Sequence, residues 1–65
     1  LRARPRGEDI SVYRALHADP RTIDGVALVL SLSLVDAAMS LARLESAGWI
    51  ADADGWFECV GSPLR

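Results

Sequence analysis

The 65-residue sequence has no lysine, one cysteine and one histidine. Because Cys59 is alone, the chain cannot form an internal disulfide, and together with His17 it cannot complete a tetrahedral zinc site. No Ser/His/Asp or Cys/His set lies at workable positions, no glycine-rich phosphate loop is present, and the carboxylates are scattered. We therefore expect no enzyme activity, no bound metal and no cofactor.

Long apolar segments are missing as well. The longest mostly apolar run, residues 25–35, is too short to span a bilayer and contains Ser31 and Ser33. No signal-peptide pattern opens the chain, so we expect a protein that does not contact a membrane and works in the reducing cytoplasm. Hydrophobic residues still make up 51% of the sequence, which favours a compact core even in a domain of this small size.

The first residues are rich in arginine and also contain Pro5 and Gly7, a composition typical of a linker from an upstream domain. We divide the sequence into an arm (residues 1–7), one domain (residues 8–60) and a tail (residues 61–65). Three residues of the arm are candidate nucleic-acid contacts: Arg2, Arg4 and Arg6. A solvated linker is the simpler interpretation of the same residues.

Three helices are expected in the domain. The first, residues 8–17, begins with two carboxylates that suit the positive end of a helix dipole, and Asp19-Pro20 follows its end. Thr22 is a natural N-cap for a second helix over residues 23–30. Ser33 caps a third helix over residues 34–47, and Gly48 supplies the residue that ends it.

The third helix has an apolar face and a more polar one. Its periodicity predicts a core face made of Leu34, Ala37, Ala38, Leu41 and Leu44. Asp36, Ser40 and Arg43 are expected on the opposite face, with Val35 and Met39 on the flank. The predicted core comprises Leu16, Ile23, Val26, Leu41, Leu44 and Ile50.

A β-hairpin is expected after the helices. Residues 49–52 and 56–60 have the composition of strands, and the Asp54-Gly55 pair between them favours a two-residue type I′ turn. That turn would pair Ile50 with Cys59, whereas a three-residue loop would shift every pair. The order of elements predicts a small α+β fold, the winged helix-turn-helix, with three helices followed by a two-stranded wing.

With these elements in place, the sequence resembles the C-terminal winged-helix domain of the bacterial DNA-processing protein A (DprA) family. The resembling segments are Thr22-Ile23-Asp24, Leu32-Ser33, Leu41-Ala42-Arg43-Leu44-Glu45, Gly48-Trp49-Ile50 and Gly55-Trp56. Ser31 and Gly25 depart from the pattern, because glycine and an acidic residue are usual there. The resemblance implies a role in natural transformation beside a Rossmann-like domain that binds single-stranded DNA and helps to load a recombinase.

The charge distribution argues against the usual work of a winged helix, which places its third helix in the major groove of duplex DNA. Five carboxylates lie in residues 33–60 against Arg43 alone, a net charge of −4, whereas residues 1–21 carry five arginines against three carboxylates, a net charge of +2. Phosphate contacts supply most of the affinity of such domains, so we expect weak nucleic-acid binding at most.

Protein contact is the alternative use of this surface, because Met and Arg suit interfaces. The candidate contact residues are Val35, Met39, Ser40, Arg43 and Trp56, although Val35 and Met39 could equally be core beneath the wing. Trp49 and Trp56 could stack on bases, but packing of the wing onto the third helix is the favoured role in so acidic a region.

We therefore predict a non-catalytic accessory module of a DprA-like DNA-processing protein, which mediates protein contacts or regulation. Its partners would be an upstream domain, another protein or a second copy of itself. One alternative is the DNA-binding domain of a transcriptional regulator. The other is a structural domain that dimerises through the third helix or the wing.

Overall fold

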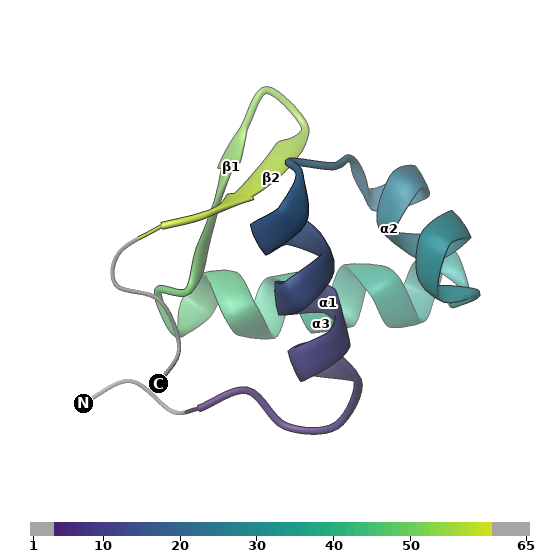
Figure 1. Cartoon of the computed structure of the whole chain (residues 1–65), viewed down its shortest axis with the longest axis horizontal. Coiled ribbons are helices and arrows are strands. Elements are labelled where there is room, and N and C mark those ends of the chain that lie inside the picture. Colours follow the sequence, from purple (N-terminus) through teal and green to yellow (C-terminus); the bar gives the residue numbers. More distant parts are fainter. Residues whose placement is uncertain (1–3, 61–65) are drawn as a thin grey trace.

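The computed structural model describes residues 4–60 (Figure 1). Its elements, in chain order, are α1 (Glu8–Ala18), α2 (Ile23–Leu30), α3 (Leu34–Ser46), β1 (Ile50–Ala53) and β2 (Trp56–Cys59). Three helices are thus followed by a two-stranded antiparallel hairpin, which is the predicted small α+β fold with a winged-helix layout. The predicted arm residue Arg2 and the predicted tail, residues 61–65, lie outside the described residues.

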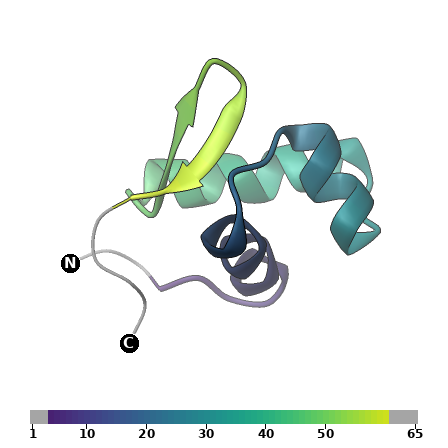
Figure 2. The ribbon, with the colours of Figure 1, turned by 45° about the horizontal axis from the view of Figure 1, so that its top comes forward.

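Helix α1 crosses α3, as two views of the molecule show (Figures 1 and 2). The hairpin lies to one side of α1 and α2 to the other, so all the elements meet around α1 and α3. The buried core contains Val12, Tyr13, Leu16, Val26, Ala27, Ala37, Leu41, Leu44, Trp49, Ile50 and Phe57. Of the six predicted core residues, five are buried and Ile23 is partly buried against them.

Both predicted N-caps are present. The Thr22 hydroxyl accepts a hydrogen bond from the backbone N–H of Gly25 at 3.1 Å, and Ser33 accepts one from Asp36 at 3.0 Å. Ser31, where glycine is usual, adopts a left-handed conformation with φ +55° and ends α2. The turn therefore forms without glycine, although a residue with a side chain is less stable than glycine in the left-handed conformation.

The hairpin has the predicted register, with Ile50 opposite Cys59. Asp54 and Gly55 both have positive φ, as a type I′ turn requires. The structure contains a further contact that the sequence did not predict. Arg21, between α1 and α2, exchanges two backbone hydrogen bonds with Phe57, at 3.1 and 2.7 Å. This bridge joins the connection between the first two helices to the wing.

The predicted faces of α3 need correction. Leu34 is 56% exposed and Ala38 is also exposed, although both were expected in the core. Ser40, expected on the opposite face, is fully buried. The physical reason is that the buried face of α3 is centred between Ala37 and Leu44, and Ser40 lies at i+3 and i−4 from these two residues on the same side of the helix.

Among residues 4–60, no single helix has both the length and the apolar character to cross a membrane. Helices α2 and α3 reach these limits only when taken together, and they are bent by 113° relative to each other.

Candidate functional site

A polar cluster joins the start of α1 to the middle of α3. The Asp9 carboxylate accepts hydrogen bonds from both Nε and Nη2 of Arg43, at 2.9 and 2.8 Å, and a third from the Ser40 hydroxyl. Asp9 and Ser40 are buried, while about half of the Arg43 side chain remains exposed. The bidentate geometry fixes the guanidinium in one orientation.

The pKa values in this cluster follow from these contacts. The Arg43 hydrogen bonds lower the pKa of Asp9 below its usual value; burial opposes this effect, and the Ser40 hydrogen bond reinforces it. The same contact with Asp9 raises the pKa of Arg43. Both groups are therefore charged at neutral pH, and the cluster is a stabilising ion pair between two helices.

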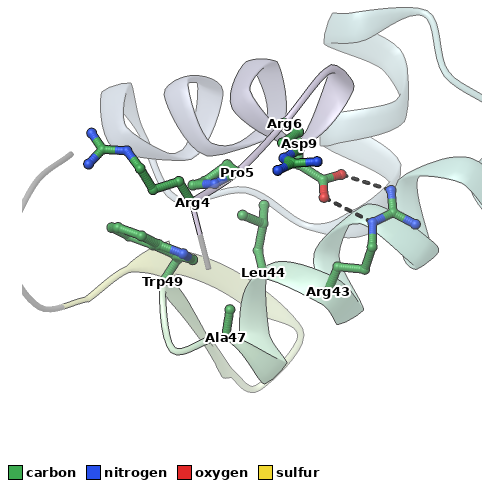
Figure 3. A pocket seen from close by; sticks show the side chains of 8 residues that line it. All are labelled: Arg4, Pro5, Arg6, Asp9, Arg43, Leu44, Ala47 and Trp49. Carbon is green, nitrogen blue, oxygen red and sulfur yellow. Dashed lines mark hydrogen bonds and ion pairs between the residues drawn. The ribbon is translucent and has the colours of Figure 1, made fainter. Parts of the chain in front are cut away.

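The cluster forms one wall of a hollow of about 580 Å³ between the arm and the carboxyl-terminal half of α3 (Figure 3). Its floor is apolar, and the guanidinium groups of Arg4 and Arg6 lie at its sides. The lining residues are Arg4, Pro5, Arg6, Asp9, Arg43, Leu44, Ala47 and Trp49. The arm thus brings two of its arginines to the same hollow as Arg43, an arrangement that can attract an anion.

Residues 4–60 contain no group of three His, Cys, Asp or Glu side chains that could hold a metal ion. Cys59 is partly buried, and burial raises the pKa of its thiol, which disfavours the reactive thiolate.

The corner between α2 and α3 exposes large apolar side chains. Val35 is 67% exposed and Met39 54% exposed on α3, and Leu28 of α2 is 82% exposed; Val29 and Leu34 are exposed nearby in the sequence. We call Val35, Ala38, Met39 and Ala42 the outer face of α3, because these four exposed residues lie opposite its buried face; the exposed Ser46 follows them on the same side in the last turn. None of the four carries a charge.

The five predicted partner-contact residues do not form one surface. Val35 and Met39 are exposed together on the outer face of α3. Ser40 is buried against Asp9, so it is not available to a partner, and Arg43 is already paired with Asp9. Trp56 is 54% exposed at the start of β2, in the hairpin, which lies across α1 from α2 (Figure 1).

The two tryptophans have different surroundings. Trp49 is buried and makes an edge-to-face contact with Tyr13 of α1, with ring centroids 5.7 Å apart. This contact fixes the base of the wing on the helices, whereas the exposed Trp56 contributes little to the core. A packing role therefore applies to Trp49 alone, and the ring contact is with α1 rather than with the predicted third helix.

Sequence reasoning missed the Asp9–Ser40–Arg43 cluster. A signal was present, because Ser40 stands among Ala37, Leu41 and Leu44 at core spacing and a buried hydroxyl needs a hydrogen-bond partner. The sequence did not indicate that this partner is Asp9, which lies 31 positions earlier in the chain.

The fold and the surfaces define a small winged-helix domain with an uncharged outer face on its third helix. No family model matches the chain, and neither a curated protein nor a solved structure matches it. The resemblance to the DprA family is untested by these comparisons and stays a prediction.

Proposed function

We propose that this chain is a non-catalytic accessory module of a DprA-like bacterial DNA-processing protein, working in the cytoplasm, that makes a protein contact through the outer face of α3. Nucleic acid would be touched weakly, and by the arm. The proposal includes an upstream Rossmann-like domain as a further partner, as the resemblance implies.

The observation that carries this proposal is the composition of the outer face of α3. In a winged helix that reads duplex DNA, this face enters the major groove and needs side chains that bond to base edges and phosphates. Val35, Ala38, Met39 and Ala42 have no hydrogen-bonding group except the weakly accepting thioether of Met39. A surface of this kind gains free energy when a protein partner removes it from water.

The position of Arg43 supports the same proposal. It is the one cation of α3, and two of its nitrogens already donate hydrogen bonds to Asp9. Asp36 and Glu45 on the same helix would repel phosphate. The alternative of a DNA-binding domain from a transcriptional regulator therefore has little support from this helix.

Weak nucleic-acid contact through the arm has a specific observation in its favour. Arg4 and Arg6 lie at the hollow beside Arg43, where their positive charges outnumber the one carboxylate, Asp9. Contacts of this kind depend on phosphate charge and fall with salt.

Titration of a fluorescently labelled duplex at physiological salt tests the proposal. We expect an affinity of about 10⁻⁴ M or weaker, as for non-specific binding. Arg4→Ala should reduce this residual binding more than Arg14→Ala, a matched loss of one exposed cation on α1. Submicromolar binding that survives Arg4→Ala but disappears in Ala42→Glu or Arg43→Ala would overturn the proposal.

A further inference from the structure

The outer face of α3 alternates large and small side chains. Val35 and Met39 are large, and Ala38 and Ala42, three positions after each of them, are small. When two copies of α3 are aligned antiparallel, with a two-fold axis between Ala38 and Met39, each Val35 lies opposite Ala42 of the other copy. The two copies of Met39 then lie close together beside the axis. Small residues opposite large ones let two helices approach closely.

The charges beside this face favour the same alignment. Asp36 and Arg43 lie on one flank of α3, seven positions apart. A two-fold axis perpendicular to the helices brings this flank of one copy against the same flank of the other, so that each Asp36 lies near Arg43 of the second copy. Arg43 can serve both contacts, because a guanidinium has five N–H donors and about half of this side chain is exposed.

A stable dimer of so small a chain needs a large share of its surface. A stable interface covers about 800 Å² on each partner, which is close to a fifth of the 4243 Å² surface of this chain. Leu28 and Val29 of α2, the helix that precedes α3, are further exposed apolar side chains. Symmetric dimers with two-fold axes are also the commonest oligomers, because one self-complementary patch is enough to form them.

We propose that a second copy of this chain covers the outer face of α3, in an antiparallel pair of α3 helices. This inference rests on the proposed function, because it names the partner of the same surface. It also fixes the register of the two helices, with Ala38 and Met39 at the two-fold axis. The contact between Asp36 and Arg43 of the two copies favours antiparallel over parallel pairing.

Disulfide trapping tests the register. In a Cys59→Ala background, Met39→Cys should form a disulfide-linked dimer under mild oxidation, because the two introduced thiols lie near the axis. Val35→Cys is the matched control on the same face: the antiparallel register displaces the two thiols by seven residues, or ~10 Å along the helices. Linking of both variants would indicate a parallel pair, and linking of neither would indicate no α3 pair; either result overturns the proposal.

Sedimentation equilibrium of the unmodified 65-residue chain tests the dimer itself. We expect a reversible dimer that Met39→Glu weakens at least about tenfold, the change typical of removing a central interface residue. Ser11→Glu, which adds the same charge at an exposed position of α1, should leave the dimer unchanged. Circular dichroism of each variant verifies that it is folded.

The two proposals fail in different ways. A monomeric chain that binds duplex weakly overturns the dimer and leaves a different protein as the partner of the outer face. A chain whose α3 binds duplex tightly overturns the proposed function and the dimer together.

Discussion

The inner and outer faces of α3 differ in what they contact, although both are rich in small and aliphatic residues. The inner face packs Ala37, Leu41 and Leu44 into the core and ties Ser40 to Asp9 of α1. The outer face leaves Val35 and Met39 exposed. Residue type alone therefore does not separate folding from binding in this helix, because orientation decides which side chains the fold uses.

Truncation of a side chain on the inner face should have the largest effect on folding. Leu41→Ala should lower the free energy of unfolding by about 2–5 kcal/mol, since it removes a fully buried side chain and leaves a cavity. In a domain of this size, such a loss could unfold much of the population. Denaturant unfolding followed by circular dichroism measures it, and a loss below about 1 kcal/mol would show that Leu41 does not lie in the core.

The polar part of the inner face should give the next largest effect. Asp9→Asn should lower the free energy of unfolding by about 1–3 kcal/mol at pH 7, because it weakens charged hydrogen bonds to Arg43 and Ser40. Ser40→Ala is a useful control: it removes one of the three bonds and leaves the ion pair, so it should cost less.

The same ion pair should make stability depend on pH. The pKa of Asp9 is lowered in the folded chain, so its contribution is present at neutral pH. It should decline as the pH falls below the ordinary aspartate value of about 4 and disappear below the folded pKa. Denaturant unfolding at pH 7 and near pH 3 should show the gap between wild type and Asp9→Asn narrowing. A gap that stays constant would contradict an ionised Asp9 in the cluster.

Substitutions on the outer face should have the smallest effect on folding. Val35→Ser and Met39→Ser should change the free energy of unfolding by roughly 0.5 kcal/mol or less, measured at concentrations low enough to keep the chain monomeric. A destabilisation comparable to that of Leu41→Ala would show that these side chains are packed in the folded monomer.

The sequence was sufficient for the local features of this fold. The caps at Thr22 and Ser33, the end of α3 at Gly48 and the turn at Asp54-Gly55 each depend on neighbouring residues, and the structure contains all of them. Leu34 was misplaced because its helical position is at the edge of the apolar stripe, where packing with the rest of the chain decides exposure.

The candidate site was less predictable because it depends on contacts between distant residues. The partners of Asp9 and the bridge between Arg21 and Phe57 join residues more than thirty positions apart. Charge counting gave residues 33–60 a net charge of −4 and predicted weak phosphate binding, which stays a prediction. It could not foresee that Arg43, proposed as a contact residue, is held by Asp9.

Amide NMR mapping with added duplex DNA distinguishes protein contact from duplex reading at the outer face of α3. We expect chemical-shift changes at the amides of Arg4 and Arg6. These changes should increase without saturation at micromolar concentrations of duplex and should vanish when salt is added. The chemical shifts of the Val35, Met39 and Ala42 amides should change no more than they do when the protein is diluted without DNA. Saturable shifts of these three amides at micromolar duplex would show that the outer face of α3 binds duplex DNA.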